Sequence, residues 1–392
     1  MRPVRIVLGG GFLAGYPEGG GHWMAFLQYL LGLRALGHDV LWLEVLRSTG
    51  DPARDRDRLA VFFRRMEEYG LRGRSAVLLH RAEVGELDLD GVEAHGLDLR
   101  QLTEFARSAD LLWNFAAALR PPLLGLFRHR VLVDLDPGHL QVSALSWDLG
   151  LDAHDTFLTV GTNLHGADCD VPRLGVSWQT FLPLVHTPMW SVTPDPGPTA
   201  AFTSVTQWTW EHVRLGERVI SVSKRDAYLA YLTLPRHAGR AFELAINLDP
   251  GDRTDDRERL LANGWRIVDP HVVASSPADY QRYLAASRGE LACPKPIHRA
   301  LRTGWFSDRS AGYLASGRPV VFEDTGLADH LPVGRGLLLF RDAEEAAAAV
   351  AEIDRDWAGH SRAARALAEE LLDARQCLTA MLEASATRSS TT

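Results

Sequence analysis

Residues 304–326 have the sequence GWFSDRSAGYLASGRPVVFEDTG, which predicts a loop, a short helix, a glycine stop and a buried strand. Ser307 or Asp308 can cap the start of the helix, which leaves backbone N–H groups pointing outward. Gly317 ends the helix, and Pro319 prevents it from resuming. A helix start beside the carboxyl end of a strand is where an α/β sheet holds a phosphate group.

The rest of the chain repeats this alternation of strands and helices on both sides of a proline-rich segment. Apolar runs predict strands at 2–8, 40–44, 111–114, 130–136 and 157–161. A second series follows at 201–205, 218–222, 242–248, 265–268, 290–292, 320–322 and 337–340. This alternation is typical of doubly wound parallel sheets. We therefore predict an α/β chain with Rossmann-like domains at 1–190 and 201–375, a linker at 191–200 and a C-terminal tail at 376–392.

The composition excludes several classes of protein. A net charge of −8 provides no electrostatic footprint for nucleic acid. Cys169, Cys293 and Cys377 lie far apart, which argues against a disulfide framework or a zinc site and suits a reducing compartment. The sequence has neither a signal-peptide pattern nor a run of about 18 apolar residues. We expect a cytoplasmic protein without a transmembrane segment.

The run from Ala315 to Val321, followed by Asp324-Thr-Gly326, resembles the donor-binding segment of GT-B glycosyltransferases. A bacterial branch of these enzymes carries a run similar to residues 304–310. The resemblance implies two domains that face each other across a cleft, the first for the acceptor and the second for a nucleotide sugar. It implies transfer of a sugar from a UDP- or dTDP-type donor to an acceptor hydroxyl. A GT-B nucleotide-sugar epimerase and a catalytically inactive sugar-nucleotide-binding protein remain alternatives.

The run from Pro17 to His22 resembles the segment of GT-B enzymes in which a first-loop histidine is the general base. The positive end of a helix dipole keeps such an imidazole neutral and able to accept a proton. Gly20 and Gly21 would let the acceptor approach closely. Asp136, at the end of a predicted strand, is the first candidate to orient the imidazole. His22 could equally be an exposed first-turn residue.

The other predicted acceptor contacts are a strand-end amide and bulky indoles, Asn114, Trp147 and Trp178. Together with Phe181 and Trp190, these indoles could form an apolar wall for a small, natural-product-like acceptor, and core packing explains such aromatic residues equally well.

The chain has only two lysines, Lys224 and Lys295, and both follow predicted strands near the donor edge. Point charges on flexible stems suit a diphosphate that gains charge as the glycosidic bond breaks. The predicted donor-binding residues are Lys224, Lys295, Arg299, Ser307, Asp308, Arg309, Ser310, Glu323, Asp324, Thr325 and Gly326.

One departure from the family concerns stereochemistry. Retaining GT-B enzymes often carry two glutamates separated by seven residues around this segment, and the equivalent positions here are Gly304 and Gly312. The departure favours an inverting reaction.

No cofactor or metal is predicted. The pattern Gly9-x-Gly11-x-x-Ala14 formally fits a dinucleotide fingerprint, but Pro17 intervenes before the helix that the fingerprint requires. Asp134-Leu-Asp136 spells the Asp-x-Asp metal motif of another glycosyltransferase fold, but the two-sheet organisation argues against that fold. The expected partners are a nucleotide sugar and a small-molecule acceptor, without nucleic acid. A homodimer is compatible with the sequence.

Overall fold

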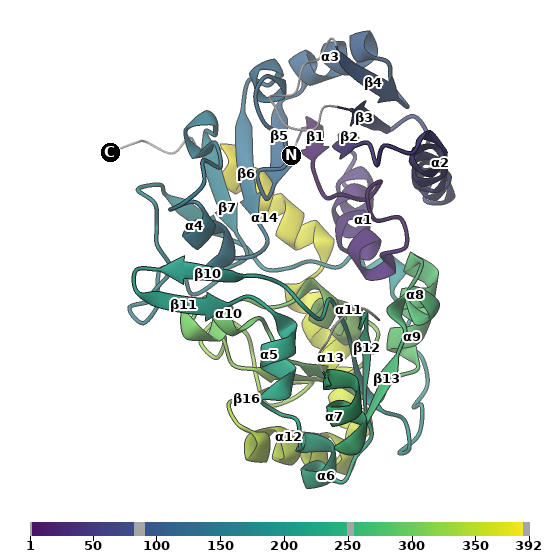
Figure 1. The fold of residues 1–392 in the computed structure, drawn as a ribbon, viewed down its shortest axis with the longest axis vertical. Helices are drawn as coiled ribbons and strands as arrows, with labels where there is room; N and C mark the ends of the chain where they lie inside the picture. Colours follow the sequence, from purple (N-terminus) through teal and green to yellow (C-terminus); the bar gives the residue numbers. More distant parts are fainter. Residues whose placement is uncertain (1, 82–90, 249–254, 387–392) are drawn as a thin grey trace.

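The structure is a computed structural model that describes residues 2–81, 91–248 and 255–386. Figure 1 shows two α/β halves stacked along the long axis of the molecule. The N-terminal half is built on the first parallel sheet and the C-terminal half on the second. Among the described residues, no helix combines the length and the apolar character needed to cross a bilayer.

The first sheet has the order β4-β3-β2-β1-β5-β6-β7-β8, and its neighbours are parallel except for β3 and β4. Its strands are β1 (Arg5–Gly9), β2 (Asp39–Arg47), β3 (Ser75–His80), β4 (Val92–His95), β5 (Leu111–Phe115), β6 (Arg130–Asp134), β7 (Thr156–Thr159) and β8 (Trp178–Thr180). The helices of this half are α1 (Gly20–Ala35), α2 (Pro52–Glu68), α3 (Leu99–Ser108) and α4 (His139–Ser143).

The second sheet is parallel throughout, in the order β13-β12-β9-β14-β15-β16. Its strands are β9 (Phe202–Thr206), β12 (Phe242–Ile246), β13 (Trp265–Val268), β14 (Gly289–Ala292), β15 (Val320–Glu323) and β16 (Leu337–Phe340). Its helices are α5 (Lys224–Leu229), α6 (Leu234–Ala238), α7 (Asp256–Ala262), α8 (Pro270–Val273), α9 (Pro277–Ala285), α10 (Pro296–Ala300), α11 (Asp308–Ala315), α12 (Ala343–Arg355) and α13 (Trp357–Leu371).

Each central strand is apolar on both faces because helices cover both sides of each sheet. In β1, Ile6 and Leu8 belong to one hydrophobic cluster, and Val7 belongs to the cluster on the opposite face. In β15, Val321 faces one cluster, whereas Val320 packs in the other. These continuous apolar runs are the signal by which the sequence predicted buried parallel strands.

The expected C-terminal tail is instead helical, as α14 (Ala374–Ala386), and residues 387–392 lie outside the described residues. Leu378 and Met381 pack in the core of the N-terminal half, where α14 lies beside α1 (Figure 1). Ser385 accepts a hydrogen bond of 2.9 Å from the indole of Trp113 on β5. The helix was not predicted because polar residues flank its apolar positions. Its burial depends on a sheet whose strand β5 lies more than 200 residues away in the sequence.

The expected linker at 191–200 is held against the C-terminal half. Arg318 donates to the carbonyl oxygens of Thr193 and Pro194, at 3.2 and 3.0 Å. The chain returns to the N-terminal half beside this first crossing, where Val185 and Asp373 form an isolated β-bridge. The two halves are therefore joined by two adjacent segments.

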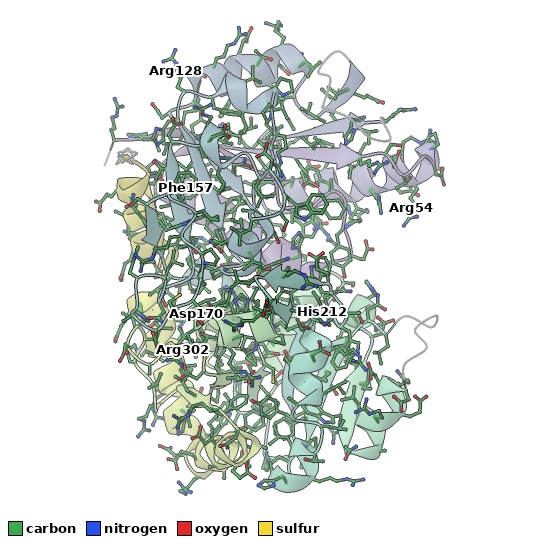
Figure 2. The ribbon with its side chains drawn as sticks, turned by 60° about the vertical axis from the view of Figure 1, so that its left-hand side comes forward. Arg54, Arg128, Phe157, Asp170, His212 and Arg302 are labelled. Atoms are coloured by element: carbon green, nitrogen blue, oxygen red, sulfur yellow. The ribbon has the colours of Figure 1, made fainter. Side chains whose placement is uncertain are left out.

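The strand expected at 218–222 is not part of the second sheet. It forms an antiparallel hairpin of β10 (His212–Leu215) and β11 (Arg218–Ser221), which Figure 1 shows at the junction of the halves beneath α4. Arg218 lies 3.4 Å from Asp170 of the N-terminal half. Figure 2 shows Asp170 and Arg302 next to each other at this junction, and the backbone N–H of Asp170 donates to the carbonyl of Leu301. The hairpin thus contributes to the contact between halves.

Candidate functional site

A cavity of about 860 Å³ lies between the two halves. From the N-terminal half it is lined by the loop after β1, the first turn of α1 and residues at the ends of β5, β6 and β7. From the C-terminal half it is lined by residues at or after β9, β11, β12 and β14 and by the start of α11. The strand order reverses between β1 and β5 and again between β9 and β14, and such reversal points are where doubly wound sheets bind ligands.

His22 lies in the first turn of α1 and lines this cavity. Its Nε2 contacts the carbonyl oxygen of Gly11. Because a carbonyl only accepts hydrogen bonds, Nε2 carries the hydrogen and Nδ1 is left as the acceptor. Burial lowers the pKa of His22, although the Gly11 carbonyl and the charge of Asp308 oppose this shift. The ring is therefore a neutral imidazole that can accept a proton.

Glu44 on β2 was not predicted, and it holds the glycine-rich loop next to His22. Its carboxylate accepts the backbone N–H groups of Leu13, Ala14 and Gly15 at 2.8, 2.9 and 3.3 Å, and the indole N–H of Trp42 at 3.2 Å. Burial raises the pKa of Glu44 to about 7, against the effect of these hydrogen bonds. The available signal was a carboxylate within the apolar run of β2, between Leu43 and Val45.

Asp136 lines the cavity but makes no hydrogen bond to His22. Its carboxylate contacts Lys295, accepts from His139 Nδ1 at 3.0 Å and lies 3.2 Å from His298 Nε2. Burial alone would raise the pKa of Asp136, but these three neighbours hold it well below its ordinary value. Because Lys295 and His298 belong to the C-terminal half, Asp136 links the halves and does not orient the imidazole as expected.

Both lysines of the chain line the cavity. Lys224 Nζ donates to the carbonyl of Cys293 at 2.8 Å and lies 5.1 Å from the centre of the Trp305 ring. Burial, followed by the positive charges of Arg309 and Lys295, lowers the pKa of Lys224 to about 7. Two lysines and an arginine therefore lie close enough to affect one another's charge.

The start of α11 completes this side of the cavity. Ser307 Oγ accepts the backbone N–H of Arg309 at 3.2 Å, as the predicted cap requires. The side chain of Arg309 is held by Glu290 at 2.5 Å and by the carbonyl of Val205 at 3.0 Å. Asp308 is exposed to the cavity. The helix start thus presents backbone N–H groups beside a fixed guanidinium.

The remaining predicted donor residues do not line the cavity. They are Arg299, Ser310, Glu323, Asp324, Thr325 and Gly326. Glu323 is buried and accepts from the hydroxyl of Tyr231 and from Arg299, both at 2.6 Å. Thr325 Oγ1 donates to the carbonyl of Trp305 at 2.8 Å. The polar turn after β15 therefore shapes the loop that carries Trp305.

The predicted acceptor residues divide into two groups. Gly20 and Gly21 line the cavity at the start of α1. Asn114 is fully buried, and its side-chain amide is bonded to both backbone polar groups of Leu119. Trp178 lies in the core, and Trp147 is 71% exposed outside the cavity lining. These last three side chains do not lie where an acceptor in this cavity would contact them.

Other aromatic side chains line the cavity instead. The apolar surface on the N-terminal side comes from Phe12, Tyr16, Phe26 and Phe115. Phe12 is 55% exposed and has a left-handed φ of 55°, so it is held at the cavity with its ring uncovered. No periodic pattern in the sequence marks such a residue, because it belongs to a loop.

Gly304 and Gly312, the two glycines compared above with glutamate positions, have no room for a side chain. Gly304 has a φ of +65°, and a Cβ there would overlap the backbone of Asn163. At Gly312 a Cβ would lie 2.8 Å from the indole of Trp190. Close packing against Asn163 and Trp190 therefore accounts for both glycines.

Several solved structures are similar to this chain over nearly its whole length, at low sequence identity. Alr3699/HepE of Anabaena, in complex with UDP and glucose, has a TM-score of 0.56 at 14% identity, over 97% of this chain and 99% of that one. An α-glucosyltransferase in complex with UDP and DNA has a TM-score of 0.58 at 12% identity, over 99% and 100% of the two chains. A structure described as trehalose-6-phosphate from E. coli bound with UDP-2-fluoro glucose has a TM-score of 0.55 at 13% identity, over 98% and 100%.

No protein-family profile matches the sequence, and no curated protein sequence matches it significantly. The structural likeness nevertheless extends over nearly the whole chain. The chain has the GT-B fold, as predicted from the run at 304–326.

Proposed function

We propose that the protein is a glycosyltransferase that moves a sugar from a UDP- or dTDP-type nucleotide sugar to a hydroxyl of a small, natural-product-like acceptor. The observation that carries this proposal is the arrangement of the cavity, with the cations Lys224, Lys295 and Arg309 on one side and the neutral His22 on the other. The structural neighbours described with UDP, or with UDP and glucose, support a donor of this class.

The donor diphosphate would bind between Lys224, Lys295 and the first turn of α11. Backbone N–H groups at a helix start and charged side chains both favour an anion, and both stabilise charge that develops on a leaving group. We propose that these groups, without a metal ion, neutralise the departing nucleotide. The apolar surface formed by Phe12, Tyr16, Phe26 and Phe115 supports the proposal of a small apolar acceptor.

His22 would remove the proton of the acceptor hydroxyl through Nδ1, and the deprotonated oxygen would attack the anomeric carbon with inversion. The imidazolium that forms would be stabilised by the charge of Asp308, which already opposes the lowering of the pKa of His22. Asp308, rather than Asp136, would therefore supply the negative charge that stabilises the imidazolium.

The test is His22→Ala, after the donor has been identified by thermal shift with UDP, dTDP and GDP sugars. We expect unchanged donor binding and a loss of transfer of about a hundredfold or more, the contribution of a general base. Unaffected transfer would reject His22 as the base, and a product of unchanged anomeric configuration would reject inversion. Epimerised donor in the absence of acceptor would identify an epimerase instead.

A further inference from the structure

Glu44 is a fully buried carboxylate beside the cavity, with only 1% of its surface exposed. Oε1 accepts the N–H groups of Ala14 and Gly15, and Oε2 accepts those of Leu13 and of the Trp42 indole. A buried carboxylate is costly unless its oxygens are hydrogen-bonded, and here each oxygen has two donors. Glu44 is therefore built into the loop as its anchor.

The loop that Glu44 anchors has a demanding backbone conformation. Gly10, Gly11 and Phe12 are consecutive residues with φ of 107°, 96° and 55°. A left-handed φ is unfavourable for a side chain such as that of Phe12 and persists only where the surroundings hold it. The three N–H groups bonded to Glu44 belong to the residues that follow directly, so the carboxylate fixes the exit of the strained segment.

The strained segment in turn fixes His22. The carbonyl of Gly11 receives the Nε2 hydrogen of His22, and this bond determines that Nδ1 is the free acceptor. If the loop moved, Gly11 would no longer select this tautomer or this ring orientation. Among the described residues, no carboxylate is hydrogen-bonded to His22, so the loop carries the role that a carboxylate has in many general-base pairs.

We propose that Glu44 is a positioning residue for His22: it holds residues 10–15 so that the Gly11 carbonyl keeps Nδ1 of the imidazole free to take the acceptor proton. The inference rests on the proposed function for its catalytic meaning. Its structural content, the link from Glu44 through the loop to the tautomer of His22, stands independently of any activity.

The main variant is Glu44→Gln, which keeps the shape of the side chain but replaces one oxygen with an N–H₂ donor. Whichever way the amide is oriented, two of the four N–H groups lose their acceptor and face a donor. We expect faster hydrogen exchange of the peptide containing residues 10–19, and a mixture of His22 tautomers in ¹⁵N NMR spectra of histidine-labelled protein.

The kinetic expectation is a fall in kcat of about 10- to 100-fold, as for a small misplacement of a catalytic group. Affinity for UDP should stay within about twofold, because every group hydrogen-bonded to Glu44 belongs to the N-terminal half and the basic residues of the donor side belong to the other. A matched control is Asp256→Asn, which alters another buried carboxylate that accepts an indole N–H, from Trp208, outside the cavity lining. This control should lower stability and leave the exchange of residues 10–19 and the His22 tautomer unchanged.

Two measurements keep the inference falsifiable if Glu44→Gln does not fold. In the unaltered protein, a His22 that carries its hydrogen on Nδ1 would overturn it directly. Glu44→Asp retains the charge on a shorter stem and should give an intermediate loss of loop protection.

If Glu44→Gln does fold, normal hydrogen-exchange protection of residues 10–19 and a single His22 tautomer in that variant would also overturn the proposal. If the unaltered protein transfers no sugar while the loop and tautomer results hold, the proposed function fails and the role of Glu44 in the loop stands.

Discussion

The protonation state of Lys224, a single buried residue, is expected to change when the donor binds. Its ammonium is surrounded by the protein and by two other cations, and burial first, then Arg309 and Lys295, lower its pKa from 10.5 to about 7. An anionic ligand favours the charged form of a nearby lysine and so raises its pKa. Donor binding at this site and protonation of Lys224 are therefore coupled.

We predict that UDP binding at pH 8 takes up about one proton, because the lysine is mostly neutral before binding and charged afterwards. Isothermal titration in buffers of different ionisation enthalpy measures this uptake. Lys224→Met should abolish the uptake, whereas Lys295→Met should weaken binding and reduce the uptake without abolishing it, because burial and Arg309 still lower the pKa of Lys224. Binding without proton uptake would contradict the assigned site.

The same shift has a defined sign for stability. Between pH 7 and 10.5 the unfolded chain holds a proton on Lys224 that the folded, unliganded protein does not. The contribution of this group to the free energy of unfolding therefore rises with pH across that window. Affinity for UDP changes in the opposite direction, since the lysine must be protonated for the complex to form.

Individual site residues differed in how far the sequence could identify them. Lys224, Lys295 and His22 were predicted from local motifs, and all three line the cavity. Asp136 was expected beside His22, but its partners are 3, 159 and 162 positions away and depend on how the halves meet. A strand end locates a side chain at an edge of the sheet and does not select its neighbour there.

At the scale of elements, the loop after β1 depends on space as well as on backbone freedom. A Cβ at Gly11 would overlap the Trp42 ring, and the substituted residue would also have to keep a backbone φ of +96°. Gly37, after α1, has a φ of +85° with nothing within 4 Å. A substitution at Gly37 therefore adds backbone strain alone, whereas a substitution at Gly11 adds both backbone strain and overpacking.

We predict that Gly11→Ala lowers the free energy of unfolding by about 1–3 kcal/mol more than Gly37→Ala does, because only the first adds an overpacking cost. Urea denaturation of both variants measures the difference. Equal losses would show that Trp42 moves aside and that the loop is not closely packed.

The sequence predicted elements well where their apolar pattern was continuous, as in β1, β6 and β15. It failed where an element is stabilised by distant parts of the chain. The hairpin β10–β11 has little apolar surface of its own and packs against α4, and α14 packs on a sheet from the opposite end of the chain. Local periodicity contains no information about such partners.

At the scale of the molecule, the two halves meet closely beside the cavity. The first N–H of α1, at Gly20, donates to the carbonyl of Ala274 in the other half at 2.9 Å. Arg65 on α2 donates to the carbonyl of Ser275 at 2.7 Å. A Cβ at Gly20 would overlap the carbonyl oxygens of Ala274 and Ser276. Only a glycine permits this approach.

We predict that Gly20→Ala forces the halves apart, increases the radius of gyration in small-angle scattering and lowers the free energy of unfolding by about 1–3 kcal/mol. Alanine is the better helix former, so a loss of stability must come from the contact between halves. Gly125→Ala, with nothing within 4 Å of its Cβ, is the control and should leave both quantities unchanged. An unchanged radius of gyration for Gly20→Ala would mean that the contact is adaptable.

The packing of α14 into the first half has a consequence for biosynthesis. The helix that completes the N-terminal core, α14, follows the C-terminal half in the chain, so the N-terminal half cannot reach its final form until α14 has been synthesised. A premature stop codon before Ala374 would leave the groove beside α1 uncovered. Nascent chains expose this apolar surface until α14 has been synthesised, and transiently exposed apolar surface of this kind favours aggregation during folding.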